Sequence, residues 1–258
     1  MRWLACAEHE IPADLGWLSA RELARLDRLR FTKRRTEFLL RRWTGKRAVA
    51  AALGPEVGAP FSLGAGLARI EMLNHPTGAP YVEIDGGPGG MDVSLSDRAG
   101  CAVGLVGEPG TAAGSLGVDL ELVEPRTERF VADFLTPAEV DYVRGRRRTD
   151  GEDGWQAAAN LVWSAKEAAL KVQRVGLRAD TRTVEVSVDH AVRPDGWSAM
   201  TVRSHRGEEF PGWWRRDGAF VLTIAFAAPH EPPVLMDGGV HLASAEPLHS
   251  WLADPTVR

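Results

Sequence analysis

The order of helical and strand patterns along the 258 residues predicts an α+β fold made of two similar α+β subdomains in tandem. Amphipathic helix patterns come first and glycine-separated apolar runs follow; a strand, helices and further strands then appear after residue 115. The stretch 107–115 is the most turn-like part of the chain. We therefore expect an N-terminal α+β half over 1–110 and a C-terminal half over 111–258, a length sufficient for a sizeable core.

Two helices open the first half. Leucines at helical spacing predict the first over 16–30, where Ser19 and Glu22 have the spacing of a capping box. The second is expected over 32–53 and ends at the glycine and proline of 54–58. Short apolar runs then predict strands at 68–74, 80–85, 92–96 and 101–107.

The second half begins with a predicted strand over 116–123. Helical patterns follow at 136–145 and 154–176, the first with Thr136 as N-cap and Pro137 behind it. Strands are expected at 183–189, 197–204 and 219–229. We find no low-complexity segment and no short repeat in the sequence.

Composition favours a soluble protein with a local anionic ligand. The chain carries 31 basic and 35 acidic residues, a net charge of −4, which argues against a general nucleic-acid binder. Basic residues nevertheless concentrate in 29–47. Cys6 and Cys101 have neither disulfide nor metal spacing, and no apolar run has the length of a membrane span. A signal peptide is not apparent, so we expect a cytoplasmic protein without membrane or nucleic-acid partners.

Asp119 and Glu121 form the first candidate site. Side chains at i and i+2 of a strand point to the same face, so the two carboxylates project together while Val118 and Leu120 face the core. Such a pair repels itself unless a proton or cation lies between, and Mg²⁺ prefers oxygen ligands of this kind. A solvated face of an edge strand is the alternative, and for an isolated D-x-E it is the more common one.

Charged residues in three of the predicted helical segments are further candidates. Glu167 and Lys171 are neighbours at i,i+4, which fits either a surface ion pair or a site, although the alanines around them leave little polar surface. Glu139 is explained by helix capping alone. The charged side chains of the basic segment 29–47 cannot all lie on the apolar face of the predicted helix. We therefore expect most of them to be exposed, either on a solvated face or in contact with phosphate. Its members are Lys33, Arg34, Arg35, Arg41, Arg42, Lys46 and Arg47.

The motifs G-V-D-L-E at 117–121 and W-S-A-K-E-A-A-L-K at 163–171 together resemble the paired signatures of the 4′-phosphopantetheinyl transferases. The segments F-L-T-P-A-E, K-R-R-T-E-F-L-L-R-R, T-G-A-P-Y and V-S-L-S-D-R have counterparts too, so the resemblance covers about residues 30–225. It is similar to the large, pseudo-dimeric Sfp-type members. The resemblance implies the 4′-phosphopantetheinyl transferase fold, with two α+β subdomains related by a pseudo-two-fold axis.

The resemblance also implies an activity: transfer of the 4′-phosphopantetheine arm of coenzyme A (CoA) to a serine of an acyl or peptidyl carrier protein, releasing 3′,5′-ADP. Asp119, Glu121 and Glu167 would hold Mg²⁺, or Mn²⁺, and the metal would neutralise charge on the pyrophosphate. Lys171 would reach the phosphates, with Lys166 in support. Glu167 or a metal-bound water would deprotonate the serine, with Glu139 as a helper.

CoA contacts are implied by the same resemblance. Arg34, Arg35, Arg42 and Lys46 would bind the 3′-phosphate, while Pro80, Ser96, Arg98 and Lys171 would contribute elsewhere. Two positions depart from the family pattern: Asp97 stands where a phosphate-binding histidine is usual, and Ala79 where many relatives have a basic residue.

Three interpretations follow from the sequence. The leading one is a monomeric Mg²⁺-dependent transferase that serves polyketide, nonribosomal peptide or fatty-acid carriers. The second, motivated by Asp97, is a catalytically altered relative that binds carrier proteins or CoA without transfer. The third is an unrelated α+β protein that carries both motifs by chance.

Overall fold

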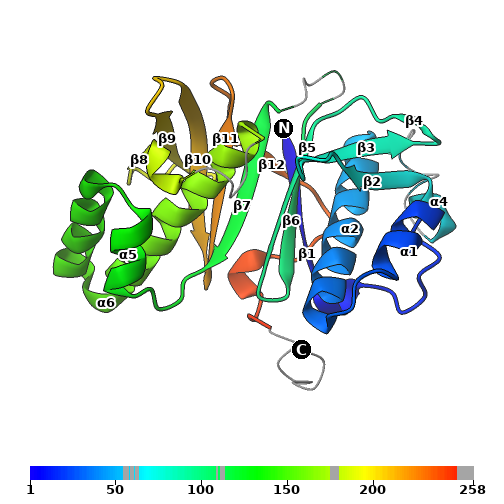
Figure 1. Ribbon diagram of the computed structural model, residues 1–258, viewed down its shortest axis with the longest axis horizontal. Helices are drawn as coiled ribbons and strands as arrows, with labels where there is room; N and C mark the ends of the chain where they lie inside the picture. The colour runs from blue at the N-terminus through cyan, green and yellow to red at the C-terminus, as the bar shows by residue number, and fades with distance from the viewer. Residues whose placement is uncertain are drawn as a thin grey trace. The chain divides into compact units, whose positions relative to one another are not determined.

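The computed structural model describes residues 1–54, 58, 61, 64–108, 110, 114–174 and 180–248. These residues form a mixed α+β structure, as predicted, with mainly antiparallel sheets packed against helices (Figure 1). The chain divides into two compact units. The first comprises Met1–Ala113 with Pro233–Arg258, and the second comprises Gly114–Pro232. No helix among the described residues is both long and apolar enough to cross a lipid bilayer.

The first unit has a four-stranded sheet in the order β12-β1-β6-β5 and a three-stranded sheet in the order β2-β3-β4. Helix α2 packs against β1 and β6 of the larger sheet and against β2 of the smaller one (Figure 1). Its elements are β1 (Arg2–Ala7), α1 (Ala20–Leu26), α2 (Thr32–Ala52), α4 (Ala65–Ala68), β2 (Ile70–Asn74), β3 (Pro80–Ile84), β4 (Gly87–Pro88), β5 (Val93–Arg98), β6 (Cys101–Val106) and β12 (Val234–Leu235).

The second unit has one antiparallel sheet in the order β7-β11-β10-β9-β8, with α6 packed mainly on β7 and β11. Its elements are β7 (Leu116–Leu122), α5 (Glu128–Phe134), α6 (Pro137–Val172), β8 (Val184–Val188), β9 (Ser198–Ser204), β10 (Glu209–Asp217) and β11 (Phe220–Phe226). Gly151 interrupts α6 with φ 67° and ψ −150°, so the helix has two parts separated by this residue. The two predicted helical segments at 136–145 and 154–176 correspond to these parts.

The two units share an order of elements. In each, a strand is followed by helices and then by further strands, and the first strand pairs antiparallel with a later one, β1 with β6 and β7 with β11. W-T-G-K at 43–46 and W-S-A-K at 163–166 share the tryptophan and the lysine. The pseudo-two-fold relation between the units stays a prediction.

Several elements escaped the sequence reasoning. β1 was missed because five of its six residues are buried, which leaves no apolar–polar alternation; α5, β10 and β12 were missed as well. Because β12 pairs in parallel with β1, residues 233–248 lie with the first unit and not with the strands that precede them. The proposed division between residues 110 and 111 stays a prediction, since 109 and 111–113 lie outside the described residues, as do 55–57 of the predicted helix stop.

Gly117 is a point of close approach between β7 and α6. A Cβ atom built on Gly117 would lie 2.1 Å from the carbonyl oxygen of Ala168 and 3.1 Å from the Cβ of Lys171. Both clashing groups belong to a helix whose neighbouring residues Ala165 and Ala169 are themselves fully buried. The glycine of G-V-D-L-E is therefore required for the helix to lie directly on the strand.

We predict that Gly117→Ala lowers the free energy of unfolding by about 2 kcal/mol or more, because backbone atoms must move to admit the methyl group. Denaturant unfolding measures the change. Gly145→Ala is the control: it lies within α6, its added Cβ would meet only an Arg148 nitrogen at 3.8 Å, and it should stabilise the protein by about 0.5–1 kcal/mol. Equal effects of the two substitutions would contradict the close approach.

Candidate active site

Asp119 lies on β7 between two fully buried residues, Val118 and Leu120, and its own side chain is only slightly exposed. The ammonium of Lys171, on α6, donates to Asp119 Oδ1 at 2.8 Å and to the carbonyl of Val118 at 2.7 Å. This contact joins the two sequence motifs. The alternative of a solvated edge face does not hold for Asp119, because the helix covers it.

Glu121 lies two residues further along β7 and has different partners. Trp163 Nε1 donates to Glu121 Oε1 at 3.0 Å, and Arg126 Nη2 lies 3.3 Å from Oε2. Arg126 is itself fixed by Asn160 Oδ1 at 2.7 Å. Sequence reasoning missed Arg126 and Asn160, since neither lies in a recognisable motif. The indole of Trp163 thus positions a site carboxylate.

Glu167 is the least satisfied carboxylate of this group. Its side chain is buried, its Oε1 atom has no hydrogen-bond partner, and within the described residues it has no ion-pair partner. Burial, followed by the negative charge of Asp119, raises the pKa of Glu167; Lys171 opposes this and Glu121 adds a smaller upward contribution, so that the pKa is about 7. Glu167 therefore exchanges its proton near neutral pH.

The residues fit a hard divalent cation by charge and donor type. Asp119, Glu121 and Glu167 supply carboxylate oxygens, and the buried Oε1 of Glu167 lacks a partner. Within the described residues, however, no three histidine, cysteine, aspartate or glutamate side chains are placed to hold a metal ion together. Asp119 and Glu121 are instead held by Lys171, Trp163 and Arg126. The metal site predicted at these residues stays a prediction.

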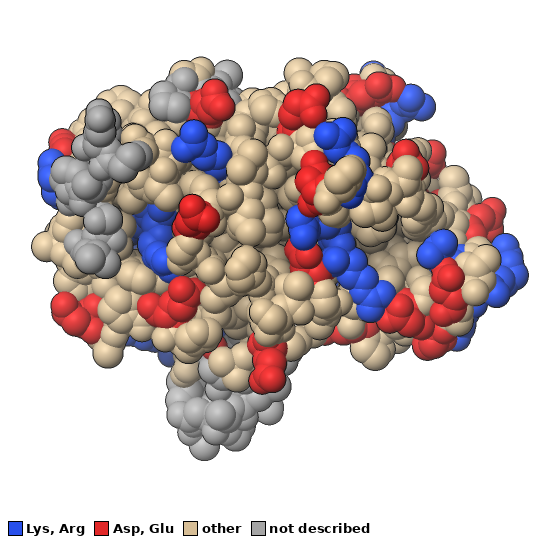
Figure 2. Space-filling view, turned by 180° about the vertical axis from the view of Figure 1, so that it is seen from behind, with Lys and Arg blue, Asp and Glu red and all other residues tan. Residues whose placement is uncertain are grey.

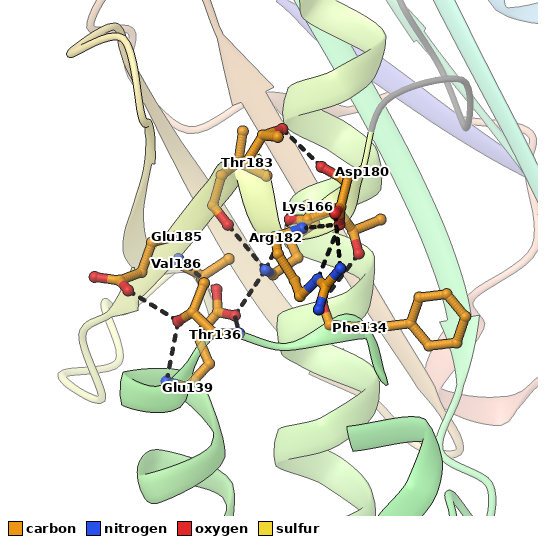
Figure 3. Close-up of polar contacts among 11 residues, drawn as sticks. Phe134, Thr136, Glu139, Lys166, Asp180, Arg182, Thr183, Glu185 and Val186 are labelled. Carbon is orange, nitrogen blue, oxygen red and sulfur yellow. Dashed lines mark hydrogen bonds and ion pairs between the residues drawn. The ribbon is translucent and has the colours of Figure 1, made fainter. Parts of the chain in front are cut away.

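Glu139 and Lys166, which we expected beside this group, lie elsewhere. Lys166 is fully buried, and its ammonium lies 2.7 Å from Glu139 Oε2. It also donates to the carbonyls of Thr181 at 2.9 Å and Val184 at 2.8 Å (Figure 3). Burial lowers the pKa of Lys166 and raises that of Glu139, while the ion pair opposes both shifts. The structure brings these two residues to each other and to the start of β8.

The basic segment is largely engaged by the fold. Arg42 and Lys46 are buried against Glu22, with Arg42 Nη2 also 2.6 Å from Asn74 Oδ1. Burial lowers the pKa of Arg42 to about 10. Arg35 donates to the carbonyl of Leu26 at 2.8 Å. The expectation that most of these charges are exposed is wrong, because carboxylates of the first unit and backbone carbonyls compensate them. Of the seven residues, only Lys33 and Arg34 are exposed.

The remaining candidates for CoA contact also lie in the first unit. Pro80 begins β3, and Ser96 and Arg98 lie on β5, with Ser96 buried. Asp97, between them, forms an ion pair with Arg41 of α2. On the face drawn in Figure 2, basic and acidic side chains are interspersed, in keeping with this pairing of charges.

Asp119, Glu121, Glu167 and Lys171 all lie in a part of the chain that matches a known protein family. A comparison with protein-family models matches residues 115–225 to the 4′-phosphopantetheinyl transferase superfamily. Residues 115–225 form a domain of this superfamily. The match contains Asp119, Glu121, Glu167 and Lys171, and it confirms the resemblance drawn from the two motifs; the Sfp-type subclass stays a prediction. No curated protein matches the chain at a significant level.

The raised pKa of Glu167 in the superfamily domain has a consequence for stability. The folded protein retains this proton up to about pH 7, whereas an unfolded glutamate loses it near pH 4.3. The contribution to stability is thus complete below about pH 4 and is lost as the pH rises through about 7. We predict that, with chelator present, Glu167→Gln gains up to about 3 kcal/mol relative to the unaltered protein between pH 4 and pH 8.

Denaturant unfolding at both pH values measures this difference. Glu128→Gln, at an exposed glutamate on α5, is the matched control and should leave the pH dependence unchanged. A pH dependence that is the same in Glu167→Gln as in the unaltered protein would show that Glu167 has an ordinary pKa.

Proposed function

We propose that this protein transfers the 4′-phosphopantetheine moiety of CoA to a serine of an acyl or peptidyl carrier protein, with release of 3′,5′-ADP and in dependence on Mg²⁺. The observation that carries the proposal is the Lys171–Asp119 contact, which joins G-V-D-L-E to W-S-A-K-E-A-A-L-K inside the superfamily domain. The fold brings Glu121 and Glu167 into the electrostatic surroundings of the same pair.

The reaction needs a proton acceptor and compensation of phosphate charge. The serine oxygen forms a bond to the phosphorus next to the pantetheine, and the bond from this phosphorus to the bridging oxygen of the pyrophosphate breaks. Glu167, whose buried Oε1 atom has no hydrogen-bond partner, would accept the serine proton. When bound by Asp119, Glu121 and Glu167, Mg²⁺ would polarise the phosphate oxygens and stabilise the developing charge.

Lys171 supplies the second cation. Its side chain is about one-quarter exposed, and its ammonium already lies against Asp119. A lysine ammonium has three donors on a flexible stem, so Lys171 can retain a carboxylate contact while donating to a phosphate oxygen. We assign it to the pyrophosphate or the leaving group.

For the 3′-phosphate of CoA we assign Arg34 ahead of the other predicted residues. Arg34 is well exposed and lies 3.2 Å from a single carboxylate oxygen of Glu37. The side chains of Arg35, Arg42 and Lys46 instead donate hydrogen bonds to other groups of the protein. Pro80, Ser96 and Arg98 stay predicted CoA contacts. Carriers of polyketide and nonribosomal peptide synthesis, and a monomeric state, belong to the same proposal.

One observation favours a second candidate, a relative that binds CoA or carrier proteins without transfer. Asp97 replaces the usual histidine, and its ion pair with Arg41 engages a cation of the basic segment. A carboxylate repels phosphate, so Asp97 cannot replace the histidine as a phosphate ligand. Binding of the nucleotide would then require Arg41 to leave Asp97, or to contact Asp97 and a phosphate at the same time.

Incubation with CoA, Mg²⁺ and a panel of apo carrier proteins tests the transfer, with intact-mass measurement of each carrier. We expect a phosphopantetheine mass gain that Asp119→Asn reduces at least about a hundredfold, since the carboxylate serves the metal and Lys171. Asp141→Asn, at an exposed aspartate of α6, should leave the rate unchanged. Binding of CoA without any mass gain would favour the second candidate.

Metal dependence is a separate expectation. Chelation should abolish the transfer, and added Mg²⁺ or Mn²⁺ should restore it, because the three carboxylates provide hard oxygen donors. Transfer at an undiminished rate in excess chelator would contradict the assignment of Asp119, Glu121 and Glu167 as metal ligands.

A further inference from the structure

Each unit contains one buried glutamate–lysine pair of the same construction. In the second unit, Lys166 donates to two backbone carbonyls and pairs with Glu139 at 2.7 Å. In the first, Lys46 donates to the carbonyls of Trp17 at 2.9 Å and Leu67 at 3.1 Å, and it pairs with Glu22 at 2.5 Å. Three acceptors satisfy the three donors of each ammonium. Both lysines are fully buried.

The two glutamates are also equivalent in position and contacts. Glu139 caps α6, accepting from Thr136 N at 2.7 Å, and its other oxygen accepts from Val186 N of β8 at 2.7 Å. Glu22 caps α1, accepting from Ser19 N at 2.9 Å, and its other oxygen accepts from Met72 N of β2. Each pair therefore joins a helix start, a strand and the following helical segment through one carboxylate.

In the second unit this pair spans the interruption of α6. Gly151 separates the helical part that begins at Pro137 from the part that carries Lys166. Helical hydrogen bonds alone cannot fix the second part relative to the first across such a break. The contact between Lys166 and Glu139 supplies a direct link between the two parts.

Glu167 follows Lys166 directly and projects about 100° further round the helix. No hydrogen bond holds its buried Oε1 atom, so its position is set by the rotation and depth of α6. Depth is fixed by the close approach of Gly117 to Ala168. Rotation is fixed by the three acceptors around Lys166.

We propose that Lys166 and Glu139 are a positioning pair that sets the rotation of α6 and thereby holds Glu167 beside Asp119 for metal binding. The pair itself contacts neither the metal nor CoA. This inference rests on the proposed metal-dependent function. The first unit provides an internal control. There the residue after the lysine is Arg47, which cannot bind a metal ion, whereas in the second unit it is Glu167.

The test compares Lys166→Met with Lys46→Met. Mn²⁺ affinity is measured by electron paramagnetic resonance under conditions where denaturant unfolding shows both variants folded. Lys166→Met leaves the buried Glu139 without its cation, whereas Glu22 keeps Arg42 at 3.8 Å after Lys46→Met. Both denaturant midpoints should therefore fall, that of Lys166→Met further. Lys166→Met should weaken Mn²⁺ binding at least about tenfold, as loss of a group that orients a metal ligand does. Lys46→Met should leave the affinity within about twofold of the unaltered protein.

A double variant, Glu139→Gln with Lys166→Met, separates positioning from stability. It removes both buried charges while an amide oxygen can still accept from Thr136 N, so the denaturant midpoint should recover relative to Lys166→Met. The Mn²⁺ affinity should stay weakened, since the contacts to the two carbonyls are not restored. Recovery of affinity together with stability would overturn the positioning role. This variant also provides the measurement if Lys166→Met does not fold.

The two proposals fail in different ways. If Lys166→Met and Lys46→Met bind Mn²⁺ equally well, the positioning role is overturned while the metal site stands. If the unaltered protein binds Mn²⁺ no better than Asp119→Asn, the metal site fails, and the positioning role fails with it.

Discussion

Burial of a charged glutamate and a charged lysine in each unit is the constraint on which the rest of the structure depends. Removing two charges from water costs several kcal/mol per ion unless every polar atom finds a partner. Glu139 meets this condition with two backbone amides and the ammonium of Lys166, and Lys166 with two backbone carbonyls. The same atoms that compensate the charges define the contact between helix and strand. The cost of burial thus makes the helix position specific.

Two glutamates on α6 show how the surroundings decide the role of a carboxylate. Glu139 is satisfied by amides and an ammonium, so nothing remains for a ligand. Glu167 is buried near Asp119 and Glu121, with an oxygen that has no partner and a pKa of about 7. A folded protein keeps such an atom mainly where a function requires it. The contrast separates the helix contact made by Glu139 from the chemistry assigned to Glu167.

Local spacing predicted most of the helices and strands, but it did not predict burial. Capping boxes and helical periodicity located α1, α2 and α6. The two motifs that contain Asp119 and Lys171 are in contact in the fold. Whether a charge is buried depends on a distant partner. Lys46 looked like a phosphate ligand because Glu22, 24 residues earlier, looked only like a cap. Arg126 was missed because its contacts with Glu121 and Asn160 exist only in the folded chain.

The glutamate–lysine pair occurs in both units, but the residue that follows the lysine has a different role in each. W-T-G-K-R in the first unit and W-S-A-K-E in the second keep the lysine and reverse the charge of the next residue. Arg47 pairs with Glu10 at 3.0 Å and donates to the carbonyl of Gly238, so it attaches the segment after β12 to its own unit. Glu167, at the equivalent position, has no such partner. The glutamate–lysine pair is present in both units, although the residue after the lysine is Arg47 in one and Glu167 in the other. We therefore infer that the pair serves to position the helix. The residue that follows the lysine determines which side chain is positioned.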